Sequence, residues 1–183
     1  MQKKLVVFLW THCSWKSSYA REFINYDKCF EWIMDGYKIT FWDDVFAIWH
    51  YHNNCWWADW CWPLQNTKNA ILDLCDRQEK TMVVEWVLLL SEPVFEVIRQ
   101  AQQKSWREVV IVYLRVPEQE ALKRVYQRNW WKKVWEWILR KKRYYDERIK
   151  VLENMFKEFK YLFIDTDRIG IKESVEQIKN LYR

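Results

Sequence analysis

Glycine is scarce in this sequence. The chain contains two glycines and three prolines among 183 residues, whereas average usage would give about a dozen glycines. This composition excludes collagen-like chains and flexible glycine-rich linkers. It also leaves few residues for backbone positions with positive φ, which chains with many helix–strand junctions usually fill with glycine.

Long apolar runs and a regular cysteine framework are also missing. The longest apolar run, Met82–Leu90, contains Glu85 and is too short to span a bilayer. The first four residues lead directly into a strand-like run ending at Leu9, so we expect no signal or transit peptide. Five cysteines without regular spacing do not fit a secreted disulfide scaffold. We therefore expect a cytoplasmic protein with no membrane partner.

The residues that are present describe a globular protein. Hydrophobic residues make up 50% and charged residues 30% of the chain, and the length suits one domain over 1–183. The formal net charge of +5 is compatible with a phosphate-bearing ligand or nucleic acid. Fifteen tryptophans stand against the two glycines. This inverts the usual ratio of the two residue types.

Short apolar runs alternate with amphipathic stretches along the chain, which predicts strands separated by helices. The predicted strands are 4–9, 36–41, 81–85, 109–114 and 161–164, of which 36–41 is either a short strand or the arm of a hairpin. The predicted helices are 16–25, 63–80, 92–104, 117–128, 138–157 and 171–181, with 43–62 irregular. Such alternation favours an α/β fold with a five-stranded parallel sheet, helices on both faces and right-handed crossovers.

The first strand and helix are joined by Trp10-Thr-His-Cys-Ser-Trp15-Lys16-Ser17. This segment has the frame of the phosphate-binding loop G-x-x-x-x-G-K-[ST], with tryptophan in both glycine positions. In such a loop, backbone N–H groups and the helix N-terminus hold phosphate oxygens. The lysine balances their charge and the following hydroxyl binds Mg²⁺. Lys16 and Ser17 stand in these two positions.

Four further segments extend the pattern: Lys16–Ile24, the acids Asp43-Asp44, Val83–Val87 and Tyr161–Asp167. With the loop, they make nearly the whole chain similar to P-loop nucleoside and nucleotide kinases, including phage polynucleotide kinases and kinases of hydroxymethylated bases in DNA. The resemblance implies a three-layer sandwich with an acceptor-site insertion at 43–62 and a lid at 129–140. It also implies γ-phosphate transfer from ATP to a nucleic-acid hydroxyl, for example on a 5-hydroxymethylpyrimidine. The alternatives are a small-molecule nucleoside or nucleotide kinase, an impaired scaffold, or a tryptophan-rich nucleic-acid-binding module.

The resemblance implies a role for each group of candidate residues. ATP would contact the loop, the start of the following helix, and Arg140 of the lid. The loop and helix residues that would contact ATP are Thr11, His12, Cys13, Ser14, Trp15, Lys16, Ser17 and Ser18. Ser17 and Glu85 would bind Mg²⁺. Catalysis would use Asp43 or Asp44 as general base, with Lys16, Arg124 and Arg128 stabilising the transferred phosphate. The acceptor would contact Tyr51, Asn54, Asp59 and Glu85.

Structural roles compete with several of these assignments. The aspartate pair suits a helix cap or a solvated turn, and Glu85 suits a buried structural carboxylate. Lys142 and Arg148 are expected on a solvated helix face. Asp165 and Asp167 suit either a contact to the nucleotide base or a simple turn. A zinc site remains a separate alternative, from His50, His52, Cys55 and Cys61, although their spacing matches no standard finger.

Tryptophan occupies glycine positions of the resembled motifs repeatedly, at Trp10 and Trp15 and again at Trp49, Trp56 and Trp57. We interpret the chain as a glycine-to-tryptophan variant of such a kinase. The alternative is that these tryptophans are native core or stacking residues. A bulky side chain forced to left-handed φ costs about 1–2 kcal/mol, so we expect weakened ATP binding.

Overall fold

The computed structural model describes residues 3–10, 16–25, 30–34, 37–48, 64–76, 80–85, 91–128 and 133–181. Its strands are β1 (Lys4–Trp10), β2 (Phe30–Met34), β3 (Tyr37–Trp42), β4 (Val45–Ile48), β5 (Thr81–Glu85), β6 (Glu108–Arg115) and β7 (Lys160–Asp165). Its helices are α1 (Lys16–Phe23), α2 (Leu64–Cys75), α3 (Glu92–Ser105), α4 (Glu118–Arg128), α5 (Lys133–Phe156) and α6 (Ile171–Leu181). Within these residues, no helix combines the length and apolar character that a membrane span requires.

One sheet runs through the molecule in the order β2-β3-β4-β5-β1-β6-β7. Five neighbouring strands, from β4 to β7, are parallel, and four of them (β1, β5, β6 and β7) are strands that the sequence predicts. The prediction of a purely parallel sheet is wrong at one edge, because β2 and β3 pair antiparallel and β3 pairs antiparallel with β4. β4 was missed because it is only four residues long and begins inside the segment 43–62, where polar residues and tryptophans obscure any strand period.

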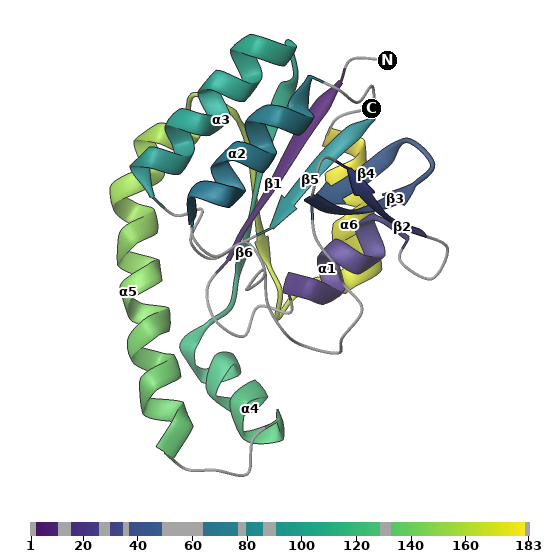
Figure 1. Ribbon diagram of the computed structural model, residues 1–183. Coiled ribbons are helices and arrows are strands. Elements are labelled where there is room, and N and C mark those ends of the chain that lie inside the picture. Colours follow the sequence, from purple (N-terminus) through teal and green to yellow (C-terminus); the bar gives the residue numbers. More distant parts are fainter. Residues whose placement is uncertain are drawn as a thin grey trace.

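Helices cover both faces of the sheet (Figure 1). α2 packs on α3 on one face, and α1 packs on α6 on the other. The end of α5 joins the α3 face, where the rings of Phe95 and Phe156 lie 5.4 Å apart. The central strands are buried on both faces, with Leu5 to Leu9 of β1 at most 1% exposed. Burial on both faces explains why these strands are continuous apolar runs in the sequence.

Helix α3 illustrates how the sequence sets an element and its ends. Ser91 has extended backbone angles at the N-cap, and Pro93 lies in the first turn, where its missing N–H has no helical partner to lose. The apolar positions of the helix face the core; they are Val94, Phe95, Val97, Ile98 and Ala101. The helix ends at Trp106, which has left-handed angles (φ 55°, ψ 27°). Glycine is the usual residue at such a position.

A buried arginine forms hydrogen bonds to three backbone segments at the edge of the sheet where the parallel strands begin. Arg107 is 1% exposed, and its guanidinium donates to the carbonyl oxygens of Cys75 at 2.7 Å, Lys4 at 2.9 Å and Lys80 at 2.6 Å. Burial lowers the pKa of this guanidinium. The three acceptors compensate the loss of its hydration, and they join the end of α2 to the starts of β1 and β5.

Two predicted boundaries differ from the observed ones. α2 ends at Cys75 and not near residue 80, and α5 begins at Lys133 and not at residue 138. The second difference concerns the predicted lid at 129–140, because residues 133–140 form the first turns of a continuous helix. The rest of that predicted lid, 129–132, lies outside the described residues.

Candidate functional site

The carboxyl ends of the parallel strands meet at one edge of the sheet. β1 ends there at Trp10, β5 at Glu85, β6 at Arg115 and β7 at Asp165. The helices that follow β1 and β5, α1 and α3, lie on opposite faces of the sheet, and these two strands are neighbours. Open α/β sheets bind ligands in the crevice that such a switch of faces creates.

Helix α1 begins at the same edge of the sheet. Lys16 and Ser17 are its first two residues and Ser18 its third, so their backbone N–H groups belong to the turn that has no helical acceptors. The helix is fixed by its buried side, where the ring of Phe23 meets that of Phe8 edge-on at 5.7 Å. A helix N-terminus held in this way attracts anions. Thr11, His12, Cys13, Ser14 and Trp15 lie outside the described residues.

Glu85 lies at this edge as well. It is the last residue of β5, it aligns with Phe8 of β1, and it is 8% exposed. A buried carboxylate needs hydrogen-bond donors or a cation close by. Its position is compatible with the predicted Mg²⁺ role and with the structural alternative. Ile48, the last residue of β4, also lies at this edge; Tyr51, Asn54 and Asp59 follow it along the chain, outside the described residues.

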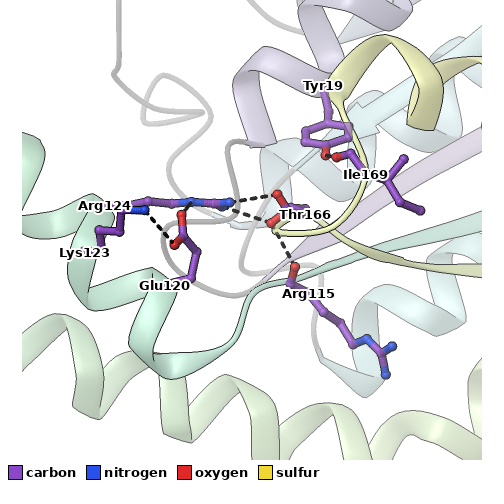
Figure 2. Close-up of polar contacts among 7 residues, drawn as sticks. All are labelled: Tyr19, Arg115, Glu120, Lys123, Arg124, Thr166 and Ile169. Atoms are coloured by element: carbon purple, nitrogen blue, oxygen red, sulfur yellow. Dashed lines mark hydrogen bonds and ion pairs between the residues drawn. The ribbon is translucent and has the colours of Figure 1, made fainter.

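A hydrogen-bond network joins α4 to the turn that follows β7 (Figure 2). Arg124 is 5% exposed, and its Nη1 and Nη2 donate to Oγ1 and the carbonyl oxygen of Thr166 at 3.0 and 2.8 Å. Its Nε donates to Glu120 Oε1 at 2.9 Å. The hydroxyl and the N–H of Thr166 both donate to the carbonyl oxygen of Arg115, each at 2.9 Å. The network holds the start of α4 against the ends of β6 and β7.

The same turn is tied to two further elements. The guanidinium of Arg115 pairs with the carboxylate of Asp165 through two bonds, at 2.8 and 3.0 Å, and lies 5.3 Å from the centre of the Phe163 ring. On the other side, the hydroxyl of Tyr19 in α1 donates to the carbonyl oxygen of Ile169 at 3.5 Å. The segment 165–169 therefore lies between α4 and α1 at the carboxyl edge.

Comparisons with known proteins show the fold. No family model matches the sequence, and no curated protein matches it significantly. Among solved structures, this chain is similar to the YorR protein from Bacillus subtilis in complex with phosphorylated GDP. The two chains are 13% identical with a TM-score of 0.56, and the match covers 97% of this chain and 95% of the YorR chain. It is also similar to shikimate kinase from Acinetobacter baumannii in complex with shikimate, with 13% identity, a TM-score of 0.53 and coverage of 98% and 92%.

The chain has the fold of P-loop kinases. Within that fold, the crevice beside β1 and the start of α1 correspond to the place where the sequence predicts a phosphate loop. The similarity at this identity concerns the fold and not the side chains of the site.

The structure does not bring Asp43 and Asp44 to the site. They form the turn between β3 and β4, both are exposed, and Asp43 has a φ of 45°. The N–H of Thr81, the first residue of β5, donates to the carbonyl oxygen of Asp44 at 2.7 Å. Because Thr81 and Glu85 are the two ends of β5, the pair lies roughly 13 Å from the carboxyl edge. A general base must reach hydrogen-bond distance of its hydroxyl. The pair instead has the alternative role, a solvated turn.

The predicted basic set is divided by the structure. Arg124 is buried and bonded to protein acceptors, so it positions the segment after β7 and is not aimed at a phosphate. Lys142, expected on a solvated face, is 5% exposed and forms an ion pair with Asp146. Arg143 pairs with Glu118 of α4, and Arg148 lies 3.6 Å from Glu92 of α3. Arg128 is the last residue of α4.

Arg140 differs from these residues. It is exposed on α5, and no ion pair is found for it within the described part of the chain. Its place on α5 does not by itself put it at the carboxyl edge of the sheet, and the predicted contact with ATP stays a prediction.

Sequence reasoning missed Thr166, Tyr19 and Glu120. The Glu120–Arg124 pair has the i, i+4 spacing of helical ion pairs, which is a signal available from the sequence. Nothing in the sequence connects Arg124 with Thr166, because they are 42 positions apart and meet only in the folded chain. No group of three potential metal ligands occurs in the described ranges, and His50, His52, Cys55 and Cys61 lie outside them.

Proposed function

We propose that this chain is a phosphotransferase that moves the γ-phosphate of ATP to a hydroxyl of a nucleoside- or nucleotide-like small molecule. The observation that carries the proposal is the short connection from β1 to α1, with Lys16 and Ser17 opening a helix at the switch point of a P-loop kinase fold. The solved structures with the same fold support this class. They include one in complex with phosphorylated GDP and a small-molecule kinase in complex with its substrate.

The chain offers suitable groups for ATP and Mg²⁺ at this edge. The N–H groups at the start of α1 would hold phosphate oxygens, and Lys16 would balance their charge. Ser17 and Glu85 would hold Mg²⁺ through oxygen atoms, which this cation prefers. Bound Mg²⁺ would neutralise charge on the β- and γ-phosphates. The anchoring of α1 through Phe23 and Tyr19 keeps the helix N-terminus in place, so this part of the site is organised before a ligand arrives.

The turn 165–169 provides a second wall for the proposed nucleotide site. The Asp165 carboxylate pairs with Arg115, so we assign it to holding the turn and not to contacting the nucleotide base. Arg124 has the same positioning task through Thr166. We propose Arg128, at the end of α4, as the remaining basic candidate for contact with the transferred phosphate.

A hydroxyl in DNA, for example on a 5-hydroxymethylpyrimidine, is the second candidate acceptor. The observations in its favour are the net charge of +5 and the exposed basic residues of α5. A catalytically impaired scaffold is the third candidate, because tryptophan stands where the resembled loop has glycine.

Thermal unfolding with and without ATP-Mg²⁺ tests the nucleotide site. A dissociation constant near 1 mM would stabilise the fold by about 1 kcal/mol at 5 mM ATP. In a chain of this length that corresponds to roughly 2–4 °C in Tm. Lys16→Ala should abolish the shift, whereas Lys172→Ala, an exposed lysine on α6, should retain it. An unchanged Tm at millimolar ATP contradicts the proposal for this chain.

Transfer of labelled phosphate then identifies the acceptor. Free nucleosides and nucleotides are compared with single-stranded DNA that carries a 5′-hydroxyl or hydroxymethyluracil. Label on the small molecules supports the main proposal, and label on DNA alone supports the second candidate. ATP binding without any transfer supports the impaired scaffold.

A further inference from the structure

The solvent face of α5 carries an aromatic and basic patch, which we define as Trp137, Arg140, Lys141 and Tyr144. The two aromatic side chains are 44% and 57% exposed. They are seven residues apart, which is two helical turns or about 10.5 Å, so they point to the same side of the helix. Two exposed rings on one side of a helix offer flat faces on which the rings of a ligand can stack.

The patch is separate from the faces of α5 that are already in use. The buried side of the helix packs on the protein through Leu139, Lys142, Tyr145, Ile149, Leu152 and Phe156. The side toward α4 carries the Arg143–Glu118 ion pair. Figure 1 shows that α4 and the first half of α5 extend beyond the sheet.

The charges on the patch select the kind of partner. The Nζ of Lys141 lies 5.8 Å from the centre of the Trp137 ring, and Arg140 is exposed next to both. Within the described residues, neither cation has a carboxylate partner. Two exposed acids border the patch along the helix, Glu136 directly before Trp137 and Glu147 one turn beyond Tyr144. The patch itself therefore carries two positive charges between two aromatic rings.

A second copy of this chain does not fit the patch well. Two such patches facing each other would place Arg140 and Lys141 of one copy close to the same residues of the other, and like charges across an interface are repulsive. A duplex does not use the patch fully either, because its bases are stacked on one another and only its phosphates reach the cations. A single strand offers both unpaired bases and phosphates.

We propose that Trp137, Arg140, Lys141 and Tyr144 form a binding surface for single-stranded nucleic acid, separate from the ATP site. Bases stack on the two aromatic rings, and Arg140 and Lys141 bind the phosphates between them. The inference does not depend on phosphoryl transfer by the chain. If the second candidate acceptor is correct, this surface would hold the strand that carries the hydroxyl.

Fluorescence anisotropy with a labelled fifteen-nucleotide thymidine strand tests the proposal, using the full chain without ATP. We expect salt-dependent binding that Arg140→Glu with Lys141→Glu weakens at least tenfold, with a shallower dependence of log Kd on log salt because two phosphate contacts are lost. Trp137→Ala should weaken binding about tenfold without changing that slope, since stacking involves no counterion release.

Matched variants separate the patch from general effects. Lys150→Glu changes the same charge on another exposed side of α5, and Tyr161→Ala removes an exposed ring on β7; both should bind like the unaltered chain. Thermal unfolding verifies that every variant is folded. Four results overturn the proposal: no binding, equal loss in the matched variants, no loss in the patch variants, or competition by ATP. Concentration-dependent dimers that Trp137→Ala abolishes would also overturn it.

Failure here and failure of the proposed enzyme are distinguishable. Lys16→Ala should remove the thermal shift with ATP and leave strand binding unchanged, and Trp137→Ala should do the reverse.

Discussion

Arg124 donates to both oxygens of Thr166, the hydroxyl at 3.0 Å and the carbonyl at 2.8 Å, across 42 positions of sequence. Because the Thr166 hydroxyl donates onward to the Arg115 carbonyl, α4, β6 and the turn after β7 share one set of bonds. This relationship fixes the turn after β7, which lies beside α1 at the carboxyl edge.

Removing Arg124 should therefore cost stability. Arg124→Met retains an apolar stem but leaves the Thr166 oxygens without this donor, and hydrogen bonds to charged groups contribute about 1.5–3 kcal/mol. We expect the free energy of unfolding in urea to fall by about 3 kcal/mol. Lys123→Met, at the neighbouring exposed position, should change it by less than about 0.5 kcal/mol. Equal effects of the two substitutions would show that the network does not stabilise the fold.

Trp106 should be replaceable by glycine with a gain in stability. It is 85% exposed and ends α3 with a φ of 55°, a conformation that costs a residue with a Cβ about 1–2 kcal/mol. Trp106→Gly removes this strain, so the Tm should rise by roughly 2–4 °C. Trp106→Ala keeps the Cβ and should give little of the rise. If alanine raises the Tm as much as glycine, the gain comes from removing an exposed indole and not from the backbone.

Trp106 bears on the interpretation of the tryptophans. It lies outside every motif of the phosphate site, yet it occupies a backbone position that favours glycine. A native core tryptophan would be buried. The glycine-to-tryptophan interpretation itself stays a prediction, and Trp106 shows only that one tryptophan occupies a left-handed backbone position where no ligand is involved. Trp137, by contrast, lies within α5 and has no positive φ, so its backbone conformation does not favour glycine.

Glu108 should give the fold a pH-dependent contribution in acid. Burial raises the pKa of its carboxyl, but hydrogen bonds from Lys160 and Lys4 outweigh burial, so its pKa lies below the ordinary value of 4.5. A depressed folded pKa means that the stabilisation is complete above about 4.5 and is lost as the pH falls through the folded pKa. The difference in unfolding free energy between the unaltered chain and Glu108→Gln should thus shrink between pH 5 and pH 3, about the range of this titration.

Unfolding in urea at several pH values checks this expectation. Glu173→Gln, an exposed glutamate on α6, serves as the control, and its difference from the unaltered chain should stay small throughout. A Glu108→Gln effect that is the same at pH 3 and pH 7 would mean that the carboxyl does not bind Lys4 and Lys160 as an anion.

The fold could be predicted from the sequence because its central parallel strands are buried on both faces. Runs such as Lys4–Leu9 and Val109–Leu114 have no polar interruption, and amphipathic helices separate them. The antiparallel edge formed by β2, β3 and β4 was not predicted in full, since short strands carry too few residues to show a period. The burial of Arg124 and Lys142 could not be predicted from the sequence either. Both lie in basic helical segments that are typical of a solvated face, and only the packing of the folded chain shows that both are buried.

The site itself was predicted less well than the fold. The aspartate pair follows a predicted strand, which is where a base is expected in a parallel sheet. β3 runs antiparallel to β4, however, so the end of β3 lies at the opposite edge. Because the sequence does not predict β4, β3 is expected to be a parallel strand, with its end at the wrong edge of the sheet. By contrast, the placement of Lys16 required only one strand, one loop and one helix, each of which the sequence marks clearly.

Restoring glycine in the loop should increase ATP affinity. Trp10→Gly with Trp15→Gly returns the resembled motif. Trp10 ends β1 without a positive φ, so its replacement removes only the bulk of the indole beside the predicted loop. At position 15 the resembled motif implies a left-handed φ, which would cost tryptophan about 1–2 kcal/mol. Since 1.4 kcal/mol is a factor of ten in binding, we expect the Kd for ATP-Mg²⁺ in calorimetry to fall at least tenfold. Trp106→Gly is the matched control: it also exchanges tryptophan for glycine, far from the loop, and should raise the Tm without changing the Kd. An ATP affinity that does not respond to the double substitution would mean that the tryptophans do not obstruct the loop, and the glycine-to-tryptophan interpretation would then lose its functional consequence.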